Sequence, residues 1–366
     1  MARTLSAILT VLLLSGGAAP AQERSLTLPQ GFRIEEFASG FGSTRFMTVD
    51  PAGTLLVSTP DQGRVVALPD RNRDGRADAA VMVADGLELP HGLAFRGGDL
   101  YIAETGRVRR FRYDPATLRA SDPAVVVPNL PPRGNHWTRT IAFGPDGRLY
   151  VSVGSSCNVC TESDPRRAAI TRYNADGSGE LRFATGLRNA VGLAVHPSTG
   201  ELWATVNERD WRGDDLPPDY ITEVKEGAFY GWPECFAAGG RVVPDSRART
   251  SAERCRRMTL PTIEIQAHSA PLGLAFYTGA QFPPSYRGSL FVAYHGSWNR
   301  TVPTGYKIVR VPFMDGRPSG PVEDFATGWL QGGRVLGRPV GLQAGADGAL
   351  YLSTDDAIYR ISYRVP

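Results

Sequence analysis

The stretch Thr140-Ile-Ala-Phe-Gly-Pro-Asp-Gly-Arg-Leu-Tyr-Val-Ser-Val-Gly154 joins two short apolar segments through a Gly-Pro-Asp-Gly turn. The same order of apolar strand, turn and apolar strand occurs six times along the chain. The copies begin at Phe46, Gly92, Thr140, Gly192, Gly273 and Gly341. The first three intervals are roughly 46 to 52 residues, a period typical of four-stranded propeller blades. We therefore predict an all-β fold, a six-bladed β-propeller.

Polar residues stand just before the first strand of each unit. The innermost strands of a propeller run in the same direction, so the residues before them converge at one mouth of the axial channel. These positions hold Arg45, His91, His136, Arg188 with Asn189, His268 and Arg338. Polar groups can simply solvate a channel. Their recurrence at one point of otherwise apolar strands favours a binding site.

The N-terminus has the pattern of a secretory signal peptide. Arg3 precedes an apolar run over 5–14, and the small residues that follow end in Ala19-Pro20-Ala21. We predict a signal peptide over 1–21, cleaved after Ala21, and a single propeller catalytic domain over 22–366. The apolar run is too short to span a bilayer, and no later segment is apolar enough. The prediction is a periplasmic or secreted protein without a membrane span.

The charge of the chain is nearly balanced. Lys+Arg number 40 and Asp+Glu 37, which gives a formal net charge of +3. Arginine is spread along the sequence rather than clustered. This balance does not point to nucleic acid or to a membrane surface as a partner.

The four cysteines fall into two local pairs, Cys157 with Cys160 and Cys235 with Cys255. In an oxidising compartment, disulfides within each pair are the favoured interpretation. The Cys157-Asn-Val-Cys160 spacing also fits a thiol redox pair, a zinc half-site or a haem attachment site. Haem attachment needs a histidine directly after the second cysteine, where Thr161 stands. Zinc would need further ligands, and the other two cysteines do not form a matching pair.

Four segments of the chain are distinctive in combination: 136–146, with the sequence HWTRTIAFGPD, 184–194, the Gly227-Ala-Phe-Tyr-Gly-Trp-Pro233 run and Gly337-Arg-Pro-Val-Gly341. Together they resemble the family of sorbosone dehydrogenases and soluble aldose sugar dehydrogenases. The likeness extends over nearly all of the chain after the predicted signal peptide. The resemblance implies a six-bladed propeller that carries pyrroloquinoline quinone (PQQ) and oxidises a sugar or a sugar-derived aldehyde.

Such an oxidation removes a hydroxyl proton while a hydride leaves, so a base must stand beside an electrophilic cofactor. Histidine is the natural base near neutral pH, and three histidines occur at the rim positions. The resemblance selects His136 as the general base. It places His91 in contact with the cofactor, and His268 is a further rim candidate.

The resemblance also assigns basic residues to the cofactor. An arginine can bind carboxylates through its fork of donors or polarise a quinone oxygen, and an asparagine both donates and accepts. Arg188 and Asn189 are expected at the reactive carbonyl, with Arg188 taking part in catalysis. Arg338 is expected at the acid groups, and Arg300 corresponds to a basic residue of the fifth blade.

Two positions depart from the glucose dehydrogenase branch of this family. Ser155 replaces an acidic residue after the third unit's second strand, and Leu336 replaces an arginine two positions before Arg338. Both changes fall at the expected substrate and cofactor rim. The sorbosone dehydrogenase-like branch is therefore the closer fit.

Calcium is expected at two places. Asp70, Asn72, Asp74 and Asp78 supply oxygen ligands at positions one, three, five and nine of a loop, with glycine at six and Arg76 at seven. Position twelve is Val81 rather than glutamate, and a solvated Asp/Gly hairpin is the alternative. The second place is implied by the resemblance, in which main-chain carbonyls, here at Glu208 and Arg209, hold calcium against the quinone.

Long segments after two of the strands offer further binding groups. The unit that begins at Gly192 runs about 81 residues, so we predict an insertion over 207–267. The segment 294–300 extends the fifth unit. Aromatic side chains there and at Trp137 can stack on a quinone or a sugar ring, or can pack between blades.

Two other functions remain open from the sequence. A calcium-dependent hydrolase of the lactonase type also uses a six-bladed propeller, but it would want carboxylates and asparagines around an axial metal. A propeller that only binds a partner would need no cofactor and no His136. The exact substrate and the electron acceptor, such as a cytochrome or a quinone, are not specified by the sequence.

Overall fold

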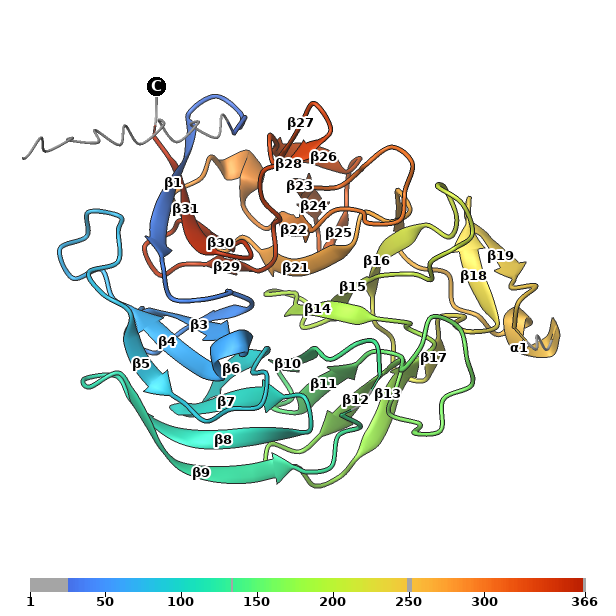
Figure 1. Ribbon diagram of the computed structural model, residues 1–366, viewed down its shortest axis with the longest axis horizontal. Coiled ribbons are helices and arrows are strands. Elements are labelled where there is room, and N and C mark those ends of the chain that lie inside the picture. Colours follow the sequence, from blue (N-terminus) through green and yellow to red (C-terminus); the bar gives the residue numbers. More distant parts are fainter. Residues whose placement is uncertain (1–25, 133, 249–251, 365–366) are drawn as a thin grey trace, which may run out of the picture.

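The computed structural model describes residues 26–132, 134–248 and 252–364, and these form six β-sheets around a central axis (Figure 1). The predicted signal peptide over 1–21 lies outside the described residues. The innermost strands are β2 (Met47–Val49), β6 (Leu93–Arg96), β10 (Arg139–Phe143), β14 (Ala190–Val195), β21 (Pro271–Phe276) and β29 (Leu342–Ala344). Each contacts the innermost strands of both neighbouring sheets, which closes the ring. The predicted six-bladed propeller is confirmed.

Within each blade the strands follow one another outward as antiparallel neighbours. The second strands are β3 (Leu55–Thr59), β7 (Asp99–Glu104), β11 (Leu149–Val153), β15 (Leu202–Val206), β22 (Leu290–Tyr294) and β30 (Leu350–Ser353). The third strands are β4 (Arg64–Leu68), β8 (Arg107–Asp114), β12 (Ala169–Tyr173), β16 (Asp219–Glu223), β23 (Lys307–Val311) and β31 (Ala357–Tyr363). The outer strands are β5 (Val81–Ala84), β9 (Arg119–Val127), β13 (Leu181–Thr185), β20 (Ile263–Ile265), β26 (Glu323–Ala326) and β1 (Phe32–Ser39).

The sixth blade combines both ends of the described chain. Strand β1 pairs antiparallel with β31, from Phe32 opposite Tyr363 to Ser39 opposite Ala357. The two strands lie side by side in Figure 1. Through this pairing, backbone groups of β1 and β31 form hydrogen bonds with each other, and the start of the chain is joined to the last blade.

The hydrophobic core lies between blades. Within the described chain, six apolar clusters each join two neighbouring blades. Leu56 of the first blade packs in one cluster with Leu100 of the second, and Trp203 of the fourth packs with Phe276 of the fifth. Because second strands are covered on both faces, β3 and β15 are buried at every position. This explains why the sequence shows short continuous apolar runs.

Hydroxyl groups on second strands connect consecutive blades at the channel. Ser58 Oγ donates to the carbonyl of His91 at 2.8 Å, and Thr205 Oγ1 donates to that of Leu272 at 2.6 Å. Ser353 makes the same bond to Arg45. Each accepting carbonyl stands just before or at the start of the next blade's innermost strand. The rim residues His91 and Arg45 are thus held through their backbone.

The predicted insertion over 207–267 is not one continuous excursion. Strands β16 and β20 lie inside that range and are the third and fourth strands of the fourth blade, so the prediction was wrong in extent. The added parts are the loop 207–218 and the segment 224–262. The latter contains β17 (Ala228–Phe229), β18 (Cys235–Ala238), β19 (Arg241–Pro244) and α1 (Ala252–Arg256). Strand β17 pairs in parallel with β13, and β18, β19 and α1 project outside the ring (Figure 1).

Smaller elements complete the described chain. They are β24 (Phe313–Met314) paired with β25 (Arg317–Pro318), β27 (Leu330–Gln331) paired with β28 (Arg334–Val335), and 3-10 turns at Pro60–Gln62 and Pro284–Tyr286. Among the described residues, no helix combines the length and the hydropathy required to span a membrane. All four cysteines are paired, Cys157 with Cys160 and Cys235 with Cys255, which confirms the favoured disulfides.

Candidate functional site

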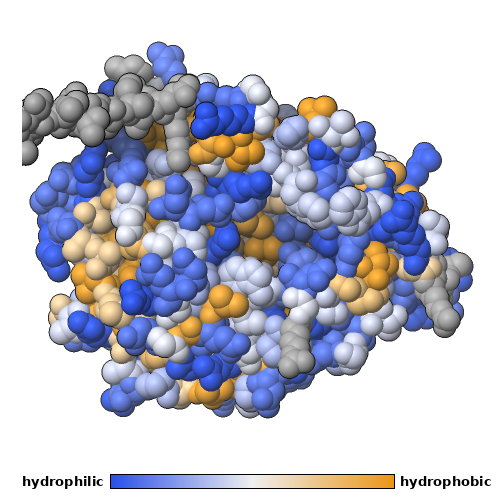
Figure 2. Space-filling model, in the orientation of Figure 1, coloured by the Kyte–Doolittle hydropathy of each residue, from blue (hydrophilic) through white to orange (hydrophobic). Residues whose placement is uncertain are grey.

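A cavity with two adjoining lobes lies at the mouth of the channel, and Figure 2 shows the middle of the ring hollowed and bordered largely by polar residues. We call the first the histidine–arginine lobe, of about 270 Å³, which is lined by Arg45, His91, His136, Trp137, Asn189, His295, Trp298 and Arg338 among others. We call the second the oxygen lobe, of about 210 Å³, which is lined by His136, Arg188, Asn189, Asn207, Glu208, Asp210, Asp219, His268, Trp298 and Asn299 among others. His136, Asn189 and Trp298 belong to both lobes.

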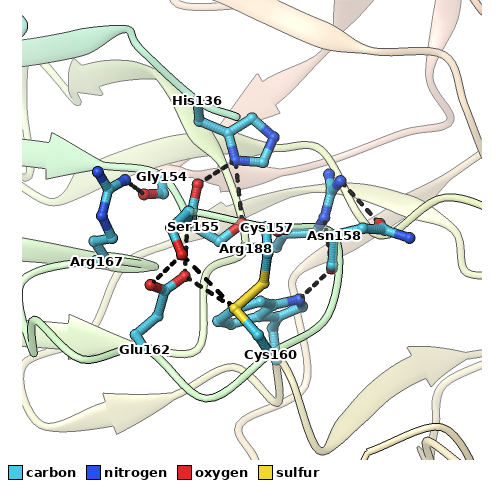
Figure 3. Close-up of a disulfide and its surroundings, with 11 residues drawn as sticks. His136, Gly154, Ser155, Cys157, Asn158, Cys160, Glu162, Arg167 and Arg188 are labelled. Carbon is cyan, nitrogen blue, oxygen red and sulfur yellow. Dashed lines mark hydrogen bonds between the residues drawn. A yellow bond between two sulfur atoms is a disulfide. The ribbon is translucent and has the colours of Figure 1, made fainter. Parts of the chain in front are cut away.

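His136 stands at the junction of the lobes with a defined tautomer. Its Nδ1 lies 2.8 Å from the carbonyl oxygen of Ser155 and 3.1 Å from the Ser155 hydroxyl (Figure 3). A carbonyl can only accept, so Nδ1 carries the proton and Nε2 has its lone pair available. Burial, followed by the positive charge of Arg188, lowers the pKa of His136 to about 3. The ring is therefore a neutral acceptor at physiological pH.

Two buried arginines hold the segment that carries His136. Arg139 donates to the carbonyls of His136 at 3.0 Å and Thr138 at 2.7 Å. Arg139 and Arg167 also donate to the same carbonyl, that of Pro131, at 2.5 and 2.8 Å. Burial lowers the pKa of Arg139 to about 9, with a further contribution from Arg167. Gly154 allows the close packing here, because a Cβ at this position would lie 2.7 Å from the His136 Cβ.

Arg188 lines the oxygen lobe, and each of its donors is engaged. Nε and Nη2 donate to the main-chain and side-chain oxygens of Asn158, at 3.3 and 3.0 Å. Nη1 donates to the carbonyls of Asn207 and Glu208, at 3.3 and 2.7 Å, and Nη2 also donates to Asp210 at 3.0 Å. These contacts use the five N–H groups of a guanidinium. A cofactor contact by Arg188 would replace one of them, and its cofactor and catalytic roles stay predictions.

His91 forms part of the wall of the histidine–arginine lobe. Its side chain is buried, and Nδ1 donates to the carbonyl of Arg139 at 3.3 Å. Its ring lies 4.3 Å from that of Phe46 and 5.7 Å, edge to face, from that of Trp137. Burial, followed by Arg45, lowers its pKa to about 3. The predicted His91 and Trp137 thus both line the cavity.

A charged corner of this lobe joins the fifth, sixth and first blades. Arg45 pairs with Asp355 at 2.8 Å, and His295 Nε2 lies 3.4 Å from the same carboxylate oxygen. Arg338 Nη1 lies 3.4 Å from His295 Nδ1 and 3.3 Å from the Gly296 carbonyl. Burial, followed by Arg45 and Arg338, lowers the pKa of His295 to about 3. The predicted Arg45 and Arg338 therefore face one space together.

The oxygen lobe contains acceptors that lack partners. Four of its buried side-chain oxygens have no hydrogen-bond partner among the described residues: Asn189 Oδ1, Asn207 Oδ1, Glu208 Oε1 and Asn299 Oδ1. Burial raises the pKa of Glu208 to about 8 and that of Asp219 to about 6. Buried oxygens without donors favour a positively charged ligand, and oxygen donors suit a hard cation such as Ca²⁺.

The predicted calcium ligands at Glu208 and Arg209 are main-chain carbonyls. The Glu208 carbonyl accepts from the Arg188 guanidinium at 2.7 Å. The Arg209 side chain pairs with Asp245 at 2.7 Å. Calcium binding by these two carbonyls stays a prediction, and the side-chain oxygens of the lobe are further candidate donors.

The other predicted metal loop and Arg300 lie outside the cavity. Loop 69–80 joins β4 to β5, and its carboxylates accept from its own backbone, as Asp70 does from Asp74 and Gly75 at 3.1 and 3.0 Å. Calcium binding by Asp70, Asn72, Asp74 and Asp78, with Arg76 inside the loop, stays a prediction. Arg300 donates to Asp214 and Asp215, and the described lining of either lobe does not include it.

Sequence reasoning did not assign several residues of the site. His295 directly follows a second strand, so its place in the repeat could have identified it. Asn158, Asn207 and Asn299 come from loops whose direction no local pattern reveals. His268, a predicted rim residue, lies in the oxygen lobe and donates from Nε2 to the Gly213 carbonyl at 2.9 Å.

Known proteins are similar to this chain over most of its length. A protein from Borreliella burgdorferi without an assigned function is 30% identical, over 97% of this chain and 96% of its own. A pyrroloquinoline quinone-dependent pyranose dehydrogenase from Coprinopsis cinerea is 26% identical over 92% of this chain. This chain spans 54% of that relative's length.

Solved structures show the same fold. The calcium structure of the Trichoderma reesei carbohydrate-active enzyme of family AA12 superposes with a TM-score of 0.82 at 24% identity, covering 93% of this chain and 97% of that one. The PQQ-bound aldose sugar dehydrogenase of Streptomyces coelicolor gives a TM-score of 0.64 at 21% identity, covering 92% and 100%. The TrAA12-like family model matches residues 26–362. The resemblance to PQQ-dependent soluble sugar dehydrogenases is thereby confirmed, and the chain belongs to the TrAA12-like family.

Proposed function

We propose that this protein is a quinoprotein dehydrogenase that oxidises a sugar or a sugar-derived aldehyde, of the aldose or sorbosone type, with PQQ and Ca²⁺ as cofactors. The relatives with assigned functions support sugar oxidation. The observation that carries the proposal is the orientation of His136, whose Nε2 is left as an acceptor at the junction of a cationic lobe and an oxygen-rich lobe.

The histidine–arginine lobe fits an acidic, planar cofactor. Arg45 and Arg338 line it, and the one carboxylate that contacts this corner, among the described residues, is Asp355. Trp137 and Trp298 add aromatic faces for stacking. Arg45 and Arg338 would hold acid groups through charge-assisted hydrogen bonds, with His91 in the wall behind them. When bound, PQQ would supply an ortho-quinone that accepts the two electrons of the oxidation as a hydride.

The oxygen lobe fits the cation. The unpartnered Asn189, Asn207 and Asn299 oxygens, with the Glu208 carboxylate, form a set of hard donors. Asn189 also lines the neighbouring lobe, so its amide can contact both ligands. These residues would bind the cation, and Arg188 would position Glu208 through the hydrogen bond to its carbonyl.

The protein's part in the reaction is to orient the substrate and remove a proton. His136 Nε2 would accept the substrate hydroxyl proton, while the Ser155 carbonyl stabilises the imidazolium through Nδ1–H. An acidic cofactor beside the ring would raise the pKa of His136 from its low value, because negative charge favours the protonated form. Trp298 is 65% exposed and would shield one side of the bound sugar.

The proposal is tested by reconstitution. Purified protein without cofactor should gain dye-linked sugar oxidation only when PQQ and Ca²⁺ are added together. If calorimetry detects no tight PQQ binding at any metal concentration, the dehydrogenase proposal is excluded. A set of aldoses and sorbosone-type aldehydes then identifies the substrate, for which Ser155 and Leu336 favour the sorbosone branch over glucose. The electron acceptor and the periplasmic or secreted location belong to the same proposal.

One observation favours a second candidate, a calcium-dependent hydrolase of the lactonase type. The oxygen lobe presents the asparagine and carboxylate oxygens that such an enzyme would want around an axial metal. Hydrolysis of lactones with Ca²⁺ alone, without PQQ, would establish it. Binding of a ligand without turnover in either assay would instead indicate a non-catalytic propeller.

A further inference from the structure

The loop closed by the Cys157–Cys160 disulfide touches both halves of the candidate site. Asn158 lies inside this loop, and its two oxygens accept from Arg188 at 3.3 and 3.0 Å (Figure 3). Arg188 in turn holds the carbonyls of Asn207 and Glu208. The loop therefore determines where one wall of the oxygen lobe lies.

Asn158 also connects the third blade to the loop after the fourth blade's second strand. Its Oδ1 accepts from the Asp210 amide at 2.9 Å, and its Nδ2 donates to the Asp210 carbonyl at 3.1 Å. The Trp232 indole donates to the Asn158 carbonyl at 3.0 Å. Asn158 therefore binds two segments. One is the loop that carries Asp210 and borders the cavity, and the other is the added segment 224–262, which contains Trp232.

The same loop reaches His136 through Ser155. The Ser155 hydroxyl donates to the Cys157 carbonyl at 2.7 Å, and the Ser155 carbonyl accepts from His136 Nδ1. Residues 156–160 are only partly buried, so apolar packing does little to hold them. A covalent closure over three residues restricts the loop where packing does not.

We propose that Asn158 is a positioning residue for the site, and that the closed Cys157–Cys160 disulfide is required to keep Asn158 and Ser155 where they orient Arg188 and His136. This inference rests on the proposed function for its kinetic consequences. Its structural consequence, the tautomer of His136, can be measured without cofactor.

The first test compares Asn158→Ala with Asn174→Ala. Asn174 also bonds through its side chain, to Ser178 and Arg148, but it lies in an exposed turn away from the cavity. Asn158→Ala should lower kcat of the reconstituted enzyme by about 10- to 100-fold, because displacement of a reacting group by about 1 Å has such effects. The control should keep wild-type kcat. Asn158→Asp keeps an oxygen that accepts from Arg188 and from the Asp210 amide, and it loses the hydrogen bond donated to the Asp210 carbonyl. Its kcat should therefore fall between those of the wild type and Asn158→Ala.

The second test removes each disulfide in turn. Cys157→Ser with Cys160→Ser should reduce kcat as strongly as Asn158→Ala, and combining all three changes should add little, since both act on one loop. Cys235→Ser with Cys255→Ser is the matched control, with a Cα separation of 5.9 Å against 6.1 Å. It should change thermal stability but leave kcat within about twofold.

¹⁵N NMR of the imidazole provides a readout that is independent of turnover. The wild type without cofactor should show His136 protonated at Nδ1, and both loop variants should show a mixture of tautomers. Full kcat and an unchanged tautomer in Asn158→Ala, or in the Cys157/Cys160 double variant, would overturn the inference. If the wild type binds no PQQ, the proposed function fails, and the tautomer measurement alone decides the role of the loop.

Discussion

The two lobes of the mouth cavity share His136 and Asn189 but have opposite electrostatic character. In the histidine–arginine lobe, Arg45 and Arg338 present positive charge, and a single carboxylate, Asp355, compensates it among the described contacts. In the oxygen lobe, four buried side-chain oxygens have no hydrogen-bond donor among the residues that the structure describes. One lobe therefore favours an anion and the other a cation. A ligand pair of opposite charge would satisfy both at once.

The first prediction concerns the junction between the lobes. His136→Ala should keep PQQ bound yet lose about 10²- to 10⁴-fold in kcat, the range expected for a positioned base. Dye-linked turnover at saturating PQQ and a PQQ titration by fluorescence separate the two effects. Near-full turnover would mean that another group is the base, and His268 and His91 would then be examined in the same way.

The second prediction concerns the acid sensitivity of the histidine–arginine lobe. The pKa of His295 is about 3 in the folded protein, against 6.5 for an ordinary histidine, so the unfolded chain binds the proton first as pH falls. His295 should thus cost about 2 kcal/mol of stability between pH 7 and pH 5. Arg45 and Arg338 oppose its protonation, and Asp355 is the acid that faces it.

Urea unfolding of the wild type and His295→Asn at both pH values isolates this contribution. Glu208 and Asp219 have raised pKa values and therefore give a slope of opposite sign, which is common to both proteins. The stability of His295→Asn relative to the wild type should increase at pH 5. An unchanged difference between the two proteins would show that His295 is not buried as a neutral ring.

The third prediction tests the cationic character of the first lobe. Arg338→Ala should weaken PQQ binding by roughly 10- to 100-fold, as expected for the loss of a charge-assisted hydrogen bond. Calcium binding in the absence of PQQ should not change. Arg334→Ala, at an exposed position in the β27–β28 hairpin, is the matched control. Equal losses in both variants would indicate a general effect of surface charge instead.

The fourth prediction tests the second lobe. Asn207→Ala removes one unpartnered oxygen and should lower Ca²⁺ affinity on the order of tenfold, measured by calorimetry without PQQ. Asn174→Ala should leave the affinity unchanged. Calcium binding that is insensitive to Asn207 but sensitive to Asp74 would place the main cation site in loop 69–80 and remove the proposed difference between the lobes.

The smallest expected effect is in that loop. Asp74 accepts from the Arg76 amide at 2.9 Å and from Asn72 at 2.9 Å, so its loss should cost about 1 kcal/mol. For a chain of this size, Asp74→Ala should lower Tm by about 2 °C, and it should diminish any rise in Tm caused by Ca²⁺. PQQ affinity should stay as in the wild type. Loss of quinone binding with an unchanged Tm would contradict this assignment.

Local patterns predicted much of the fold and part of the site. The strand–turn–strand repeat and the polar residue before each innermost strand led directly to six blades and to His91, His136 and Arg338 in the cavity. The loop segments were harder to predict from the sequence. The predicted insertion over 207–267 took in β16 and β20 because both are short and separated by 39 residues of added chain, which hides the repeat.

The sequence by itself determined the blade number and the rim positions, because alternation, turn residues and burial on both faces act over a few neighbouring residues. Only the tertiary structure decided that β1 closes the sixth blade and that every donor of Arg188 forms a hydrogen bond to a protein oxygen. It also decided that the side-chain oxygens of Asn189, Asn207 and Asn299, all in one lobe, have no hydrogen-bond partner within the described part of the chain. Those outcomes depend on contacts between loops far apart in the chain, and the direction of a loop follows from what it packs against rather than from its own residues.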